Sequence, residues 1–343
     1  MFPPDRRVTI RDVARTAGVS TTTVSDALNG RGRLPAATRD RVAAIAGELG
    51  YSPRAAARNL REGRTGQVGL YCPLLTEVRG GLAGTGYYLD LAMGAAEAAL
   101  AEELALLLLP AGLPPERLAA VDVDGLIVAD PLRDDPGVAA VPRHVPVVTC
   151  EQDPTPGAEH AGCVASNHER ALHELLDHLA RGGARRVALI AAGAQSAWSA
   201  ALGAAYRAWC AQRGAPDRFV EVPISPRPEY SERAAEALMD AADPPDAIVC
   251  APDGGAAAVV RVLARRGLRV PSDVLVASCV DGPLMPSAQP PVTAIDLQPA
   301  LAGRMAATLL AELLAGRVAP GRTEDVPTRL VRRASTAPDG GTA

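Results

Sequence analysis

Lysine is absent from this 343-residue chain, and aromatic residues make up only 3% of it. All 35 basic residues are therefore arginine, a bias that coding preference alone can produce. No stretch of eighteen apolar residues occurs, so we expect no membrane-spanning helix. The first seven residues lack the apolar core of a signal peptide, and we expect a cytoplasmic protein.

Catalytic and metal-binding motifs are also missing. The six cysteines form no CxxC pair, and most lie in apolar runs such as Ala247–Ala251, as reduced core residues do. Neither a GxxxxGK[ST] phosphate loop nor a GxSxG nucleophile elbow is present. His168, His173 and His178 are spaced by five residues, which turns each about 140° from the last around a helix. We therefore expect no enzyme activity, metal or cofactor.

The charge of the chain is unevenly distributed. Residues 1–64 contain 12 arginines and six acidic residues, a net charge of +6, whereas the remainder carries −10. A chain of this length exceeds one ordinary core, so two or three domains are expected. A basic N-terminal part on an acidic body indicates a polyanionic partner for the N-terminal part only.

Two short helices joined by a glycine are predicted near the N-terminus. Thr9 and Asp12 resemble a capping box, Gly18 permits a sharp turn, and Ser20 is a good N-cap for the second helix. The first helix has an apolar stripe at helical spacing, formed by Ile10, Val13, Ala14 and Ala17. The second helix is expected to turn Val24, Ala27 and Leu28 inward and Thr21, Thr22, Ser25 and Asp26 outward.

A third helix is predicted from about Pro35 to Leu49, with Gly50 as its stop. Helix, glycine turn and helix make the helix-turn-helix pattern, whose second helix presents its N-terminal side chains to the DNA major groove. The alternative is a plain three-helix bundle with a solvated face. The local charge of +6 and the Ser-Thr-rich run favour the DNA-binding interpretation.

The N-terminal motifs extend beyond a generic helix-turn-helix. They comprise Thr9-Ile-Arg-Asp-Val-Ala14, Ala17-Gly-Val-Ser20, Thr23-Val-Ser25, Leu28-Asn29, Thr38-Arg39, Leu49-Gly-Tyr-Ser-Pro53 and Ala57-Arg-Asn-Leu60. This set resembles the lactose-repressor/galactose-repressor (LacI/GalR) family of bacterial transcription factors. The resemblance is dense over residues 8–62 and continues more thinly to about residue 335.

The resemblance implies which side chains contact DNA. Thr21, Thr22 and Asp26 fall where the family reads base edges. Threonine can bond to a base or a phosphate, whereas aspartate only accepts, most naturally from cytosine N4. We expect Asp26 to sharpen base choice at some loss of affinity, because phosphates repel it. The remaining expected contacts in this part are Thr9, Ser20, Thr23, Ser25, Asn29, Arg31 and Arg33, the last three near the DNA backbone.

The segment after Tyr51 resembles the family's hinge helix. Ser52 and Pro53 suit an N-cap and a first helical position, but the helix of residues 54–61 is too short to be stable alone. In relatives such a hinge folds when paired with its twin on DNA. Leu60 matches the apolar wedge that relatives insert into the minor groove; the alternative is a linker residue packed on the body. The other expected hinge contacts are Arg54, Ala57, Arg58 and Arg61.

From Gln67 onward, apolar strand-like runs alternate with helical stretches, which indicates parallel sheets covered on both faces. The expected fold class is a small all-α helix-turn-helix head on an α/β body of two lobes that resembles periplasmic binding proteins. The expected divisions are a head at 1–51, a hinge at 52–66, a first lobe at about 67–165 and 294–322, a second lobe at about 166–293 and 323–333, and a disordered tail at 334–343.

Candidate effector-binding residues come from the strand ends that face the cleft of such a body. Tyr87, Tyr88 and Trp198 are candidates for stacking, with core packing as the alternative. Asp253 and Asp281 each follow a predicted strand, and Asp253 is alternatively a helix N-cap.

Two positions depart from the sugar-responsive members of the family. Many relatives carry an arginine where this chain has Leu202, and two adjacent acids where it has Val280 and Asp281. A sugar held by bidentate arginine and aspartate bonds is therefore not expected here. A less polar effector, or none, fits better.

The leading hypothesis is a homodimeric transcription regulator, most simply a repressor, that binds double-stranded operator DNA and responds to a small molecule. One alternative is a soluble binding protein or enzyme of the same two-lobed fold whose head only oligomerises. A second alternative is a regulator that needs no ligand.

Overall fold

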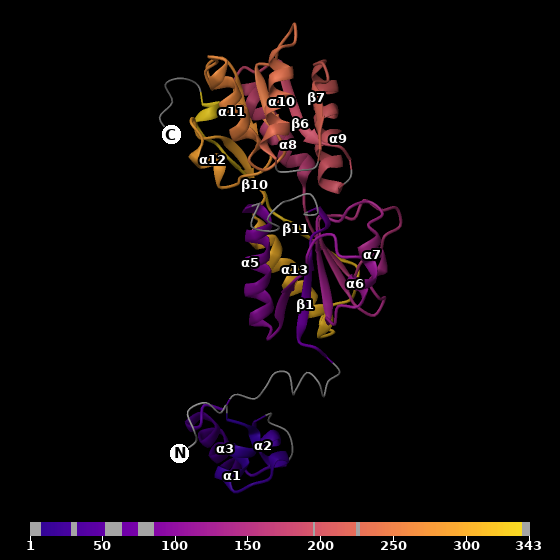
Figure 1. Cartoon of the computed structure of the whole chain (residues 1–343), viewed down its shortest axis with the longest axis vertical. Helices are drawn as coiled ribbons and strands as arrows, with labels where there is room; N and C mark the ends of the chain where they lie inside the picture. The colour runs from indigo at the N-terminus through magenta and orange to yellow at the C-terminus, as the bar shows by residue number, and fades with distance from the viewer. Residues whose placement is uncertain are drawn as a thin grey trace. The chain divides into compact units, whose positions relative to one another are not determined.

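The computed structural model describes residues 8–28, 33–51, 64–74, 86–194, 196–223 and 227–337. The chain forms two compact units, one ending at Gly66 and one beginning at Gln67 (Figure 1). No helix among the described residues is long and apolar enough to cross a membrane.

The first unit is a head of three helices: α1 (Ile10–Ala17), α2 (Thr21–Leu28) and α3 (Ala36–Glu48). Its small core joins Val13, Val24 and Val42, one from each helix and each fully buried. The apolar stripes predicted from helical spacing therefore face one another, which leaves the polar sides of the helices outward.

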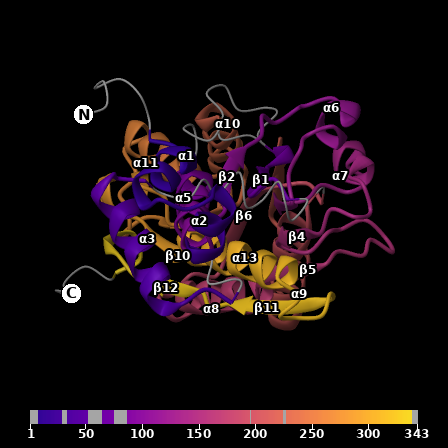
Figure 2. The same ribbon diagram turned by 90° about the horizontal axis from the view of Figure 1, so that it is seen from below.

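The second unit begins with a lobe built on a parallel sheet, the first sheet, in the order β11-β5-β4-β3-β1-β2. Helices α5 and α13 cover one face of this sheet, and the short helices α6 and α7 cover part of the other (Figures 1 and 2). The strands are β1 (Gln67–Tyr71), β2 (Ala105–Leu108), β3 (Gly125–Ala129), β4 (Val147–Cys150), β5 (Gly162–Ser166) and β11 (Arg322–Val326). The helices are α5 (Gly86–Ala101), α6 (Pro115–Ala119), α7 (Pro136–Ala140) and α13 (Pro299–Leu314).

The second lobe has a second six-stranded sheet, in the order β12-β10-β9-β8-β6-β7. Helices α8 and α9 pack on one face, and α10 and α11 on the other. The strands are β6 (Val187–Ala192), β7 (Phe219–Val222), β8 (Ala247–Cys250), β9 (Leu275–Ser278), β10 (Thr293–Asp296) and β12 (Arg329–Val331), the last antiparallel to β10. The helices are α8 (His168–Arg181), α9 (Ala197–Arg213), α10 (Pro228–Met239), α11 (Gly255–Arg265) and α12 (Leu284–Ser287).

The points where the chain passes between the lobes differ from the expectation. We placed residues 294–322 in the first lobe, where α13 does lie, but β10 pairs with β9 in the second sheet. We placed residues 323–333 in the second lobe, where β12 does lie, but β11 pairs with β5 in the first sheet. Both differences have one cause: the residues of a strand do not by themselves say which sheet it joins.

The segment after Arg333 was expected to be disordered, and its first part is not. Ala334–Thr336 form a 3₁₀ turn in the second lobe. The buried hydroxyl of Ser335 accepts from the N–H of Thr293 and donates to the carbonyl of Val276, at 2.9 and 2.6 Å. The polar composition that suggested a solvated tail instead satisfies backbone groups at the end of the second sheet.

Helices α5 and α13 cross at unusually close range. A Cβ atom built on Gly94 would lie 2.0 Å from the carbonyl oxygen of Ala300, and one on Gly303 would lie 2.0 Å from that of Leu91. Only glycine allows the two backbones to approach this closely. The crossing holds the helical layer of the first lobe together.

We expect Gly94→Ala to lower the free energy of unfolding of the body by roughly 1–3 kcal/mol, because the added methyl group meets backbone that cannot move aside. Urea denaturation measures this. Gly203→Ala in α9 is the control, since its Cβ would come no closer than 3.3 Å, to the flexible end of Arg207. Equal unfolding midpoints for the two variants would contradict the close-crossing account.

Candidate functional site

The turn between α1 and α2 is fixed by short polar contacts. The hydroxyl of Thr9 donates to Asp12 at 2.7 Å, and its backbone N–H donates to the same carboxylate at 3.0 Å. Gly18 takes the left-handed conformation with φ of 66°, and the Ser20 hydroxyl accepts from the N–H of Thr23 at 3.0 Å. The capping box, the glycine stop and the N-cap were all predicted, and together they orient α2.

The outward face of α2 contains the residues expected to read DNA. Thr21 and Thr22 are exposed, and Ser25 and Asp26 are half-buried at the side of the helix. Thr9 and Thr23 use their hydroxyl groups inside the turn, so they support the reading face rather than extend it. Arg33 is exposed. The other expected contacts lie outside the described residues: Asn29, Arg31, Arg54, Ala57, Arg58, Leu60 and Arg61.

Two of the residues considered for the effector site belong to the interior of the second lobe, and a third, Asp281, is half-buried and paired. Leu202 and Val280 are buried in the cluster that α8 and α9 form on the second sheet. Asp281 receives two hydrogen bonds from the guanidinium of Arg333, both at 2.8 Å. Its charge is therefore neutralised by a partner 52 residues away in the chain.

Asp253 links the two lobes. Its carboxylate accepts from the N–H of Gly254, next to it, and from the N–H of Gly86, the first residue of α5. Burial raises the pKa of this carboxyl group, and the two N–H donors oppose that rise. The helix α11 has Gly254, not Asp253, at its N-cap, so the N-cap alternative for Asp253 is wrong.

The aromatic candidates lie where the lobes meet. Tyr87 packs against the cores of both lobes, and its ring meets that of Tyr88 edge-on with centroids 5.0 Å apart. Trp198 packs on the second lobe, and its indole Nε1 is buried with no hydrogen-bond partner. All three aromatic side chains are partly buried against a core, which agrees with the predicted alternative of core packing. The indole N–H of Trp198, however, has no hydrogen-bond acceptor.

Sequence reasoning missed a buried polar group at the carboxyl ends of β3 and β4. We call it the strand-end cluster: Asp130, Glu151, His168 and Tyr88. Tyr88 donates to Asp130 at 2.6 Å, and Nε2 of His168 lies 2.7 Å from Oε2 of Glu151. Asp130, Glu151 and His168 are each less than 9% exposed. Burial, with Glu151 nearby, raises the pKa of Asp130 to about 7, although Tyr88 and His168 act to lower it.

The signal for this cluster was present. Asp130 and Glu151 directly follow buried strands, and Asp253 and Asp281 come three residues after the ends of theirs, so the same rule should have selected all four. The structure adds that both residues have positive φ, 47° for Asp130 and 79° for Glu151. Such backbone geometry is uncommon for residues other than glycine and concentrates at functional sites.

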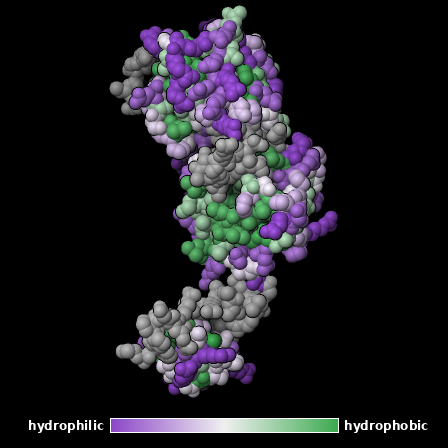
Figure 3. Space-filling model, viewed as in Figure 1, coloured by the Kyte–Doolittle hydropathy of each residue, from purple (hydrophilic) through white to green (hydrophobic). Residues whose placement is uncertain are grey.

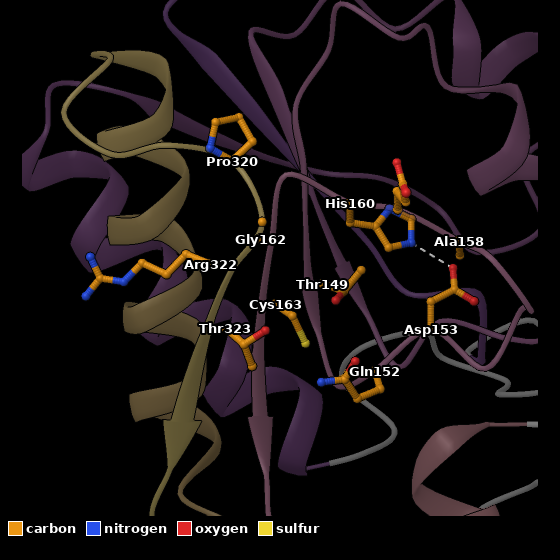
Figure 4. A pocket seen from close by; sticks show the side chains of 12 residues that line it. Thr149, Gln152, Asp153, Ala158, His160, Gly162, Cys163, Pro320, Arg322 and Thr323 are labelled. Atoms are coloured by element: carbon orange, nitrogen blue, oxygen red, sulfur yellow. Dashed lines mark hydrogen bonds and ion pairs between the residues drawn. The ribbon is translucent and has the colours of Figure 1, made fainter.

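A separate hollow lies near the β11 edge of the first sheet, beside β5 and β11 (Figure 4). Its volume is about 490 Å³, and Asp153 and His160 form a 2.8 Å pair on its wall. None of the residues proposed from sequence lines it. Within the described part of the chain, no group of three metal-ligating side chains occurs here or elsewhere.

Comparison with known proteins identifies both units. Residues 9–54 match the family described as bacterial regulatory proteins, lacI family, and residues 176–336 match the periplasmic binding protein-like domain. The chain is 31% identical over 341 residues to the HTH-type transcriptional regulator CelR of Thermobifida fusca, an overlap of 95% of this chain and 96% of the relative.

Two solved structures are similar over nearly the whole chain. A transcriptional regulator CelR–cellobiose complex has a TM-score of 0.73 at 27% identity and covers 96% of this chain and 100% of its own. A Lac repressor dimer bound to operator and the anti-inducer ONPF has a TM-score of 0.78 at 24% identity, with coverage of 96% and 99%. The second of these similarities is one of fold.

We expect Asp130→Asn to remove a pH-dependent loss of stability. With its folded-state pKa near 7 against 3.8 in the unfolded chain, Asp130 binds a proton more tightly when folded. Its contribution is therefore fully present below about pH 4 and is lost as pH rises to about 7. The variant should gain about 2–4 kcal/mol relative to wild type between pH 4 and pH 8.

Urea denaturation of the body at pH 4, 6 and 8 checks this expectation. Asp134→Asn is a matched control, because Asp134 is exposed and also has positive φ, 54°. A stability difference between Asp130→Asn and wild type that stays constant across these pH values would rule out the raised pKa.

Proposed function

Because this chain belongs to the LacI family of bacterial regulatory proteins, we propose that it represses transcription by binding a palindromic operator as a homodimer, under the control of a small molecule bound between its lobes. The family membership and the fold class predicted from the sequence are both confirmed. The similar proteins are transcription regulators, not enzymes. The observation that carries the proposal is the outward face of α2 on a basic head joined to an acidic two-lobed body.

The head supports a division of labour between base reading and positioning. Thr21 and Thr22 lie at the start of α2, where a recognition helix meets base edges, and Asp26 follows one turn later. Asn29, Arg31 and Arg33 would lie near the DNA backbone and position the helix. Residues 52–66 would form the hinge, with Leu60 as the wedge and the arginines at 54, 58 and 61 along the minor groove.

The first lobe supplies a surface for a second copy. Leu89, Met93 and Leu100 project from α5 with 46, 55 and 75% exposure, and Leu107 and Leu108 of the edge strand β2 are exposed beside them. Figure 3 shows this apolar area on the first lobe. A patch of this kind on a soluble protein commonly marks an interface. A two-fold axis through it would pair two heads for a palindromic operator.

The effector would bind where the strand ends of both lobes meet. Tyr87, Tyr88 and the strand-end cluster lie on the first-lobe side, and Trp198 on the second-lobe side. The similar regulator was solved with cellobiose. In this chain Leu202 and Val280 are core residues and Asp281 is paired with Arg333, so these three positions offer no charged clamp for a sugar.

A movement of one lobe against the other would displace α5 and with it the proposed dimer surface. The helix starts at Gly86, which donates to Asp253 of the second lobe, and it carries the exposed leucines of the proposed interface. A ligand that favours one arrangement of the lobes would therefore also bias the pairing of the heads. A regulator without a ligand is the second candidate, and the buried Leu202 and Val280 favour it.

Selection of bound sites from a random DNA pool should yield a near-palindrome, and binding should weaken steeply with salt. Thr22→Ala should change the preferred bases and weaken the selected site by about 1–3 kcal/mol while nonspecific binding persists. Thr38→Ala, on α3, is the control for a hydroxyl lost elsewhere on the head. An unenriched pool and a flat salt response would refute DNA recognition.

Leu100→Glu should convert the dimer into a monomer at micromolar concentration, because it places a charge in the centre of an apolar interface. Sedimentation velocity measures the mass, and operator affinity should fall in parallel. Gln212→Glu adds the same charge to an exposed position on α9 of the other lobe and should leave the dimer intact. A dimeric Leu100→Glu protein would place the interface elsewhere.

A further inference from the structure

We propose that the effector is a cationic amine whose ammonium group is held by Asp130 and Glu151 beside the rings of Tyr87 and Tyr88. This inference rests on the proposed function, since it names the class of ligand for the site between the lobes.

The charge balance of the strand-end cluster is the first argument. Two carboxylates are buried together, and among the residues that the structure describes the basic group paired with them is the imidazole of His168, 2.7 Å from Glu151. The groups that act on Asp130 are Glu151, Tyr88 and His168, and no arginine is among them. The body contains other arginines, but Arg333 of the second lobe already donates to both carboxylate oxygens of Asp281. A buried carboxylate without a counter-charge is costly, and a ligand cation would supply that charge.

Unused hydrogen-bonding capacity is the second argument, and it is independent of charge. The indole N–H of Trp198 is buried and finds no acceptor. Trp198 lies in the first turn of α9, and a β-bridge between Ser196, the N-cap of α9, and Leu132 brings the start of this helix to the chain two residues after Asp130. Native proteins rarely leave a buried donor unsatisfied, so an acceptor atom from a ligand is expected there.

The aromatic residues give the third argument. Tyr87 and Tyr88 meet edge-on, and Tyr87 contacts the cores of both lobes. Tyrosine faces attract cations, and the attraction grows when the cation is removed from water. Carboxylates with adjacent aromatic rings therefore favour an ammonium group over a neutral hydroxyl.

The departures from the sugar-responsive pattern agree with this class of ligand. A bidentate arginine would repel an ammonium group, and the position that carries it in relatives is the buried Leu202. The acid that would grip hydroxyls in the second lobe is replaced by the buried Val280. The two carboxyl groups of the strand-end cluster lie on the first lobe.

Matched pairs of probes test the proposal on the full-length protein. Each pair differs in charge and little in size: glucosamine with N-acetylglucosamine, tyramine with tyrosol, and putrescine with 1,4-butanediol. Isothermal titration calorimetry at pH 7.5 should show at least one amine binding tenfold or more tightly than its neutral partner. That amine should also change affinity for the selected operator, and its neutral partner should not.

Variants identify the site. Asp130→Asn and Glu151→Gln should each weaken binding of the amine tenfold or more, whereas the exposed Asp134→Asn should leave it unchanged. Tyr88→Phe keeps the ring and both carboxyl groups and removes only the hydroxyl that donates to Asp130, so it should weaken amine binding less than the acid variants do. This variant provides a second test if the acid variants fail to fold, and the loss of all preference for the amine over its neutral partner would then overturn the inference.

The outcomes separate this inference from the proposed function. Neutral partners that bind as tightly as the amines, amines that bind all variants equally, or no response to any amine would overturn the inference. In each case an enriched palindrome in the DNA selection would leave the repressor proposal standing. Amine binding without DNA preference would refute the repressor proposal and keep the site.

Discussion

The close crossing of α5 and α13 is the constraint on which the rest of the body depends. Two glycines, Gly94 and Gly303, bring the backbones together, and this sets the position of α5 on the first sheet. The same helix begins against Asp253, carries Tyr87 where the lobes meet, and exposes leucine and methionine side chains along its length. A rigid helix with one end at the lobe junction and one face on the surface can transmit a small displacement without absorbing it.

Local chemistry made the head and the alternation of the body predictable. The Thr9–Asp12 cap, the Gly18 stop and the stripe through Val13 act between residues a few positions apart, and such signals are visible in the sequence. The membership of β10 and β11 was not predictable in the same way, because it depends on which distant edge each strand meets. The pairing of Asp281 with Arg333 is also a long-range contact that no local pattern announces.

The residues of the candidate site between the lobes were also predicted only in part. Tyr87, Tyr88, Trp198 and Asp253 were identified because they follow strand ends, and each lies at or near the junction. Asp130 and Glu151 obeyed the same rule and were overlooked, so that failure lay in applying the rule. Leu202 and Val280 were selected only by resemblance to relatives, and the structure buries both in the core of the second lobe.

The docked 3₁₀ turn at the end of the chain has a practical consequence for handling the protein. His178 and Thr293 both form hydrogen bonds with the hydroxyl of Thr336, and Arg333 pairs with Asp281. Residues 333–336 are therefore attached to the second lobe by their side chains. An affinity tag or fluorescent fusion attached beyond Ala337 would leave these side-chain contacts in place. A truncation placed before Ser335 would remove the hydroxyl that pairs with the buried N–H of Thr293 and the carbonyl of Val276, and would destabilise the second lobe.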